Sequence, residues 1–230
     1  GIEALARIRD EYGQFISPSQ FIPLCEDTGL IIPLSEFVLK EACNQLHHWH
    51  KAGFEDLTMA INISGKQLHL PHLVDDIMST VHGAQVPADK IELELTEQVF
   101  IENIQSHTNF MHAVRDNGMS LAIDDFGVGY SSLSYLKNFP VTSLKIDRSF
   151  INDLPDNEDD AVIVQTIINL ARNLNIQLVA EGIETPEQVD FLMSRECGVG
   201  QGYLFSRPLP AEKITELLEN YHGLIPIQIA

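Results

Sequence analysis

The stretch Ser120–Gly127, Ser-Leu-Ala-Ile-Asp-Asp-Phe-Gly, joins an apolar run to two adjacent carboxylates and a glycine. The apolar run predicts a buried β-strand over Ser120–Ile123. Successive side chains of a strand point to opposite faces, so Asp124 and Asp125 can share one site only where the strand ends and the chain turns. The glycines that follow allow such a turn because glycine adopts backbone angles that other residues avoid. We therefore expect a strand whose end carries paired carboxylates; an ordinary acidic turn is the alternative.

Comparable apolar stretches recur along the chain, and most are separated by helical patterns. They are Ile2–Leu5, Leu57–Ile63, Ile91–Leu95, Ser143–Ile146, Ile176–Ala180 and the turn near Gly200–Tyr203. Polar residues lie in these stretches or directly after them: Glu3, Asn62, Glu94, Lys145, Glu181 and Gln201. Alternating strands and helices indicate a parallel sheet, and about seven such units predict a closed barrel, whose chemistry lies where the strands end.

The helical patterns complete this α/β prediction. They cover Glu36–Lys51, Leu73–Val81, Ile104–Asn117, Ser131–Asn138, Asp159–Asn173, Pro186–Ser194 and Ala211–Tyr221, with Ser35 as the expected cap of the first. The predicted fold is a TIM-like (β/α)8 barrel over residues 1–221, followed by an apolar tail over 222–230. An eight-fold barrel needs one more strand, which we expect before residue 1. We expect Leu224–Ala230 of the tail to pack against the barrel or a neighbour.

The length, net charge and cysteine content of the chain restrict the kinds of ligand and surface that it can bind. The chain has 230 residues, 44% of them hydrophobic, and a net charge of −19. One barrel-sized domain suits this length. The acidic surface disfavours nucleic acid polymers and direct contact with anionic membranes, whereas a small anionic ligand can bind where metal ions offset its charge. Three unclustered cysteines suggest reduced thiols and a cytoplasmic setting.

The polar residues at the predicted strand ends suit hard divalent cations. Carboxylate and amide oxygens are the ligands of Mg²⁺ and Mn²⁺, and none of the nine histidines falls at a predicted strand end. Neighbouring carboxylates would repel one another unless cations lay between them. Lys145 would need a carboxylate partner if it pointed inward. The alternative is a lysine that extends outward to solvent, and Glu181 faces the same choice.

The chain resembles the EAL domain family of bacterial cyclic-di-GMP phosphodiesterases over about residues 1–210. The resemblance begins with Glu3-Ala4-Leu5 and Arg7. It continues through Asn62-Ile63-Ser64, Glu94-Leu95-Thr96-Glu97, Asp124-Asp125-Phe126-Gly127, Tyr130-Ser131-Ser132-Leu133, Leu144-Lys145-Ile146-Asp147, Ala180-Glu181-Gly182-Ile183-Glu184-Thr185 and Gln201-Gly202-Tyr203. Each short motif is weak alone, but their number and order make a chance match negligible.

The resemblance implies a role for each matching residue. One metal ion would be held by Glu3, Asn62, Glu94 and Asp124. Asp124 would bridge to a second ion held by Asp125, with Glu181 and Gln201 nearby through water. Lys145 would orient the bridging water, Arg7 would contact a substrate phosphate, and Gln201 would also bind the substrate. Glu97 would brace the regulatory loop that connects the site to a dimer partner, which contains Asp125, Phe126, Gly127, Val128 and Gly129.

The implied activity is opening of cyclic-di-GMP to linear pGpG with two Mg²⁺ or Mn²⁺ ions, and Ca²⁺ is expected to inhibit. The resemblance also implies a homodimer and a cytoplasmic domain. That domain would be fused to sensor or cyclase domains in a parent protein that can be membrane-anchored. Two alternatives stay open. One is a catalytically silent cyclic-di-GMP receptor, and the other is a metal-dependent barrel enzyme that acts on a non-nucleotide substrate.

Overall fold

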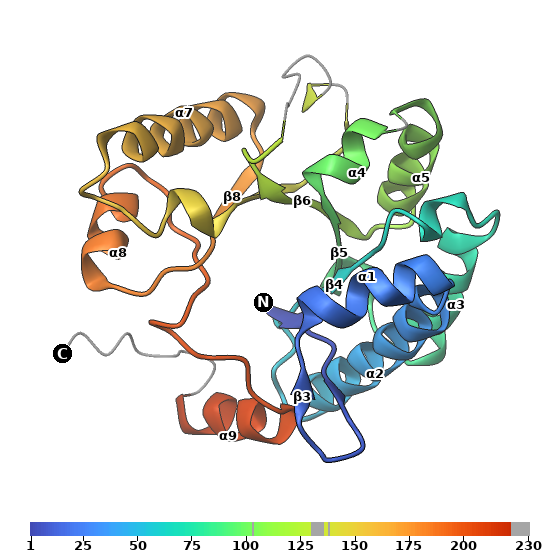
Figure 1. Cartoon of the computed structure of the whole chain (residues 1–230). Coiled ribbons are helices and arrows are strands. Elements are labelled where there is room, and N and C mark those ends of the chain that lie inside the picture. The colour runs from blue at the N-terminus through green and yellow to red at the C-terminus, as the bar shows by residue number, and fades with distance from the viewer. Residues whose placement is uncertain (103, 130–135, 138, 222–230) are drawn as a thin grey trace. The chain divides into compact units, whose positions relative to one another are not determined.

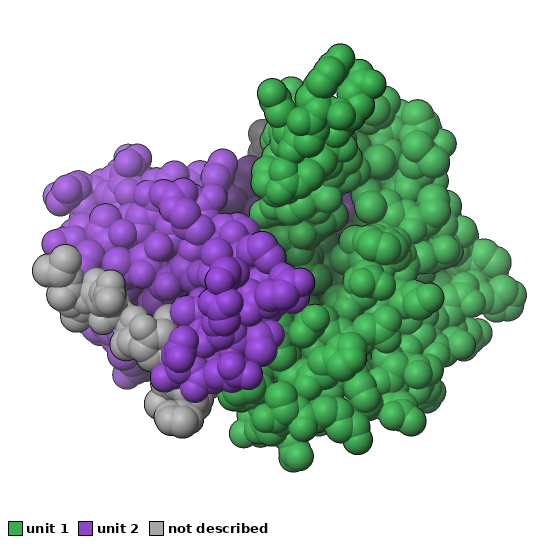
Figure 2. Space-filling model, turned by 90° about the horizontal axis from the view of Figure 1, so that it is seen from below, with its two compact units in different colours: residues 1–95, 105–120 green, residues 96–104, 121–230 purple. Residues whose placement is uncertain are grey.

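The computed structural model describes residues 1–102, 104–129, 136–137 and 139–221 (Figure 1). The chain divides into two compact units, coloured separately in Figure 2. Unit 1 comprises Gly1–Leu95 and Gln105–Ser120, and unit 2 comprises Thr96–Ile104 and Leu121–Ala230. Within the described residues, no helix combines the length and the apolar character needed to cross a membrane.

Unit 1 contains three of the six parallel strands: β1 (Ile2–Ala4), β4 (Met59–Asn62) and β5 (Ile91–Thr96), and β4 pairs with both of the others. Their registers place Glu3 opposite Ala60, and Asn62 opposite Glu94. A short antiparallel hairpin, β2 (Ile8–Arg9) with β3 (Phe15–Ile16), follows β1 and is not predicted by the sequence pattern.

The helices of unit 1 are α1 (Pro18–Thr28), α2 (Ile31–Lys51), α3 (Leu73–Gly83) and α5 (Ile104–Asp116), with 3-10 turns η1 (Gln67–His69) and η2 (Ala88–Lys90). The expected start of α2 is wrong, because the helix begins at Ile31 and Ser35 lies inside it. Helix α1 is not predicted by the apolar periodicity. It ends at Gly29, whose left-handed φ of 77° suits glycine at a helix end.

Unit 2 contains the other three parallel strands: β6 (Ser120–Phe126), β7 (Ser143–Ile146) and β8 (Gln177–Ala180), and β7 pairs with both of the others. Its helices are α4 (Glu97–Glu102), which the sequence pattern missed, α7 (Glu158–Leu174), α8 (Pro186–Met193) and α9 (Ala211–Tyr221), with the 3-10 turn η3 (Arg148–Phe150). The predicted turn near Gly200–Tyr203 forms an isolated bridge between Gly200 and Ala180. The expected helix over 131–138 falls mostly on residues outside the described ranges, and the expected packing of Leu224–Ala230 lies wholly outside them.

Strand β6 is longer than predicted and irregular where its carboxylates lie. It extends to Phe126, and its register with β7 shifts between Ile123 and Phe126. Asp125 has a left-handed φ of 52°, and Gly127 follows at 105°. The extra residue and the left-handed backbone break the strict alternation of side chains, so Asp124 and Asp125 are not forced to opposite faces. The predicted turn therefore occurs within the strand end and not after it.

Candidate metal site

Lys145 is a buried cation in unit 2. It lies on strand β7, between β6 and β8, with 3% of its surface exposed. Its Nζ is 2.8 Å from Glu181 Oε1 and 3.4 Å from Asp124 Oδ1. These partners belong to the ends of the neighbouring strands β8 and β6. The inward, paired lysine is therefore confirmed, and the outward alternative is wrong.

Three carboxylates gather around this lysine. Ligand oxygens of Asp124, Asp125 and Glu181 lie within 4.8 Å of one another. Lys145 supplies one positive charge against these three groups, so mutual repulsion still opposes their approach. Hard divalent cations bind clustered carboxylate oxygens. The donor set on unit 2 therefore fits a hard divalent cation.

Asp125 is a carboxylate whose surroundings disfavour its charged form. Burial, the charge of Asp124 and a hydrogen bond with Asp147 raise the pKa of Asp125 to about 6. Burial also acts to raise the pKa of Asp147, but hydrogen bonds from the hydroxyl and backbone N–H of Ser149 outweigh it and leave that pKa lowered. The Asp125–Asp147 hydrogen bond therefore holds its proton on Asp125 at mildly acidic pH. A metal ion that bound Asp125 at such a pH would have to displace this proton.

Glu97 supports the chain that follows Asp125. Its Oε2 accepts hydrogen bonds from the backbone N–H groups of Gly127, at 2.7 Å, and Gly129, at 3.2 Å. Only 4% of Glu97 is exposed. A Cβ on Gly129 would lie 2.8 Å from Glu97 Oε1, so glycine permits this close approach. Val128 between the two glycines is exposed.

Glu181 and Gln201 are held side by side by the backbone. Gln201 donates its N–H to Ala180 O at 2.8 Å and accepts from Ile183 N–H at 3.1 Å. A Cβ on Gly202 would lie 2.0 Å from Ile183 O, so any other residue there would separate the two segments. The side chain of Gln201 is exposed. Both predicted residues thus lie at the carboxyl end of β8.

The predicted ligands of unit 1 lie on its three strands. Asn62 Nδ2 donates to Glu3 Oε1 at 2.8 Å. That bond orients the Asn62 amide, whose carbonyl oxygen is the atom a hard metal prefers. Glu94 is opposite Asn62 in the register and is 1% exposed. Arg7, after β1, is exposed, and its guanidinium donates to Ala6 O at 2.8 Å.

Some supporting residues escape prediction from the sequence. Ser64 Oγ, two residues after Asn62, donates to Glu26 Oε1 at 2.7 Å. Asp147 belongs to a quoted motif, but its contact with Asp125 is not predictable from the motif. The buried amide of Gln188 bonds to residues 36 and 37 positions away. A single sequence carries no signal for contacts at such separations.

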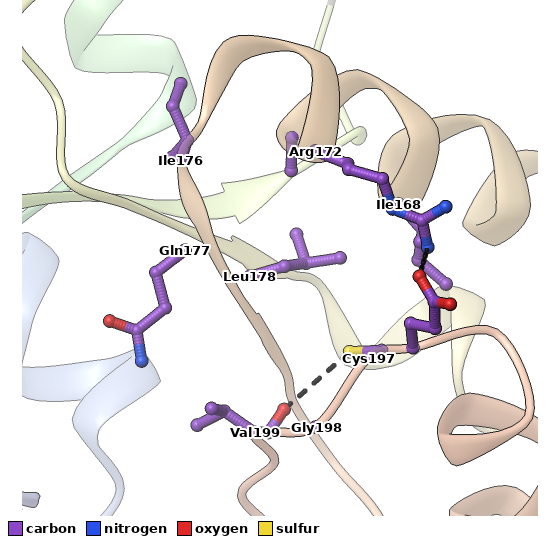
Figure 3. Close-up of a pocket in the computed structure, with 10 residues that line it drawn as sticks. Ile168, Arg172, Ile176, Gln177, Leu178, Cys197, Gly198 and Val199 are labelled. Atoms are coloured by element: carbon purple, nitrogen blue, oxygen red, sulfur yellow. Dashed lines mark hydrogen bonds and ion pairs between the residues drawn. The ribbon is translucent and has the colours of Figure 1, made fainter.

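A cavity in unit 2 lies apart from these groups. It measures about 270 Å³ and lies between α7, the start of β8 and the segment Glu196–Val199 (Figure 3). Arg172 and Glu196 form an ion pair of 2.6 Å at this cavity, and Cys197 Sγ contacts Val199 O. None of the predicted site residues is among the described residues that line it. The carboxylate cluster, not this cavity, is the candidate site.

Comparison with known proteins identifies the family. The family model described as "EAL domain" matches residues 1–208. The chain belongs to the EAL domain family. It is 43% identical over 96% of its length to the cyclic di-GMP phosphodiesterase NbdA of Pseudomonas aeruginosa. It is 42% identical over 93% of its length to the bifunctional diguanylate cyclase/cyclic di-GMP phosphodiesterase MucR of the same organism.

Solved structures of EAL domains have the same fold. The structure titled "PaMucR Phosphodiesterase, c-di-GMP complex" superposes with a TM-score of 0.90 at 42% identity, covering 93% of this chain and 87% of that chain. The EAL enzyme Bd1971, bound to cAMP and cyclic-di-GMP, superposes with a TM-score of 0.87 at 31% identity, covering 94% and 59%. The predicted TIM-like α/β fold of the EAL type is confirmed. The chain spans 28% of NbdA and 31% of MucR.

Proposed function

We propose that this EAL domain hydrolyses cyclic-di-GMP to linear pGpG with two Mg²⁺ or Mn²⁺ ions. The observation that carries the proposal is the buried Lys145 between Asp124 and Glu181, beside Asp125. In such a cluster the lysine holds the carboxylates in place, so that they would keep their positions when metal ions bind. The metal ions would in turn offset the negative charge of a phosphodiester substrate. The related enzymes named above support the choice of substrate.

Each residue has a proposed part in the reaction. Bound divalent ions would activate water and offset the charge of the phosphodiester. Asp124, Asp125 and Glu181 would act as ligands, Glu181 through water, and Lys145 would orient the attacking water. Glu3, Asn62 and Glu94 would supply further ligands, Arg7 would contact a phosphate, and Gln201 would lie at the water shell. The oxygen of water would form a new bond to phosphorus while the P–O3′ bond breaks. The 3′ oxygen would leave as a hydroxyl group, with a proton that replaces the one lost by the attacking water.

Supporting residues would set the alignment of these groups. Glu97 would keep the segment from Asp125 to Gly129 in place through its two backbone hydrogen bonds. We propose further that this segment, which contains Phe126 and Val128, links the site to the second copy of the chain in a homodimer. Fusion to sensor or cyclase domains and a cytoplasmic location complete the proposal.

The test is product formation from cyclic-di-GMP with Mg²⁺ or Mn²⁺, against EDTA and Ca²⁺. Metal-dependent pGpG, with inhibition by Ca²⁺, is the expected result. Lys145→Ala should abolish it, and the exposed Lys213→Ala is the matched control. Tight binding of intact cyclic-di-GMP without product formation would contradict the enzymatic function and favour a receptor. Turnover of unrelated phosphodiesters but not of cyclic-di-GMP would contradict the substrate.

A further inference from the structure

Gln188 is a buried amide whose hydrogen bonds are complete. Only 2% of it is exposed. Its Oε1 accepts from the backbone N–H groups of Glu184, at 2.7 Å, and Thr185, at 3.0 Å. Its Nε2 donates to the carbonyl oxygens of Ile151, at 2.9 Å, and Asn152, at 3.1 Å. These four bonds use both acceptor positions and both donor hydrogens of the amide.

The two ends of this amide bind two different connections. Ile151 and Asn152 follow β7, the strand that carries Lys145, and Glu184 and Thr185 follow Glu181 at the end of β8. The connections also touch directly, because a Cβ on Gly182 would lie 2.5 Å from Arg148 Cβ. Gln188 therefore joins the segment after the lysine to the segment after its carboxylate partner.

We infer that Gln188 is a positioning residue that holds Glu181 against Lys145 and the metal cluster. The inference rests on the proposed function, since it assigns Glu181 to a metal site. Supporting partners of metal ligands restrict the orientation of those ligands, and Gln188 acts one step further out, through the backbone. A rotation of the Glu181–Thr185 connection would lengthen the 2.8 Å Lys145–Glu181 ion pair.

Gln188 also belongs to the capping box of α8, with Thr185 as the N-cap. A role confined to capping is the competing explanation. The two roles use different atoms: capping uses Oε1 and the backbone of Gln188, whereas the bonds to Ile151 and Asn152 use Nε2. A glutamate serves equally well in a capping box but brings no amide hydrogen to those carbonyl groups. Gln188→Glu therefore separates the roles.

The experiment measures Mn²⁺ binding by electron paramagnetic resonance and amide hydrogen exchange of the metal-free protein. The variants are Gln188→Glu and Gln188→Met, with Val164→Ala as a control. Val164 is fully buried in α7 and makes none of the four hydrogen bonds of Gln188, so its truncation lowers stability and leaves those bonds intact. We expect both Gln188 variants to bind Mn²⁺ about 10-fold more weakly. We also expect exchange at residues 181–183 to accelerate, while the control retains wild-type affinity and exchange there.

Each outcome decides the inference. Wild-type Mn²⁺ affinity and exchange in Gln188→Glu would overturn it, because capping alone would then explain the residue. Equal weakening in Val164→Ala would also overturn it, because loss of stability would be the cause. Faster exchange with no Mn²⁺ binding even by the wild-type protein would contradict the proposed metal site. The anchoring of the Glu181 connection by Gln188 would stand.

Discussion

The two units hold their proposed ligands in different ways. In unit 1, the Asn62 amide donates to Glu3, so a neutral group orients the carboxylate. In unit 2, the buried ammonium of Lys145 forms ion pairs with Asp124 and Glu181. A neutral amide orients a carboxylate without reducing its charge, whereas an internal cation does both. We therefore expect loss of the Lys145 ion pairs to lower the stability of unit 2. We expect loss of the Glu3–Asn62 hydrogen bond to lower mainly the activity.

Removing the cation of unit 2 should have the largest effect. Lys145→Ala leaves Asp124 and Glu181 without their shared buried partner, and such losses cost about 3–5 kcal/mol. We expect kcat to fall by about 10³-fold or more, and the metal-free protein to unfold at lower temperature. Mg²⁺ should restore part of the melting temperature, because the ion binds only the folded cluster. Calorimetry with and without Mg²⁺ is the measurement. If metal-free Lys145→Ala melted at the wild-type temperature, unit 2 would not depend on the lysine for stability, and the difference between the units would be contradicted.

The matching change in unit 1 is Glu3→Ala. Activity should fall by at least the roughly 10- to 100-fold that loss of a supporting residue costs at a metal site. Stability should fall by only about 1 kcal/mol, because the Asn62 bond is a single contact on a half-buried carboxylate. Kinetics combined with urea unfolding separates the two quantities. Glu36→Ala, at an exposed position in α2, is the control. If Glu3→Ala lowered stability as much as Lys145→Ala does, the two units would not differ in this respect.

A smaller effect is expected from Glu97→Gln. The neutral amide still offers an oxygen to Gly127 and Gly129, but the charge-assisted part of both hydrogen bonds is lost. We expect a loss of about 2 kcal/mol in transition-state stabilisation, or roughly 30-fold in kcat/KM. Steady-state kinetics across Mn²⁺ concentrations is the measurement. An unchanged kcat/KM would show that the loop keeps its position without the carboxylate.

The smallest effect concerns pH. Because the pKa of Asp125 is raised to about 6, Mn²⁺ affinity should fall about 10-fold per pH unit below pH 6, as the ion competes with a proton. For the metal-free protein, this raised pKa stabilises the fold below about pH 4 and that contribution is lost as pH rises towards 6. Asp147→Asn removes a charge that raises the Asp125 pKa, so the midpoint of Mn²⁺ binding should move to lower pH. A midpoint that moves upward would contradict this assignment.

Prediction from the sequence succeeded where the pattern is local. All six parallel strands overlap stretches whose apolar runs predict them, and Pro186 and Gly118 mark helix limits close to those observed. It failed where a short element lacks its own periodicity. The β2–β3 hairpin and α4 are too short for a clear repeat, and α2 begins five residues before its expected start.

The sequence by itself determined the α/β alternation, the order of the strand ends and the residue types at those ends, because these depend on neighbours within a few positions. Only the tertiary structure decided which groups meet. The bulge at the end of β6, the pairing of Lys145 with Glu181, and the bonds from Gln188 to Ile151 and Asn152 join residues far apart in the chain. The physical reason is that burial makes such polar pairings obligatory, whereas local periodicity specifies only that a group is buried.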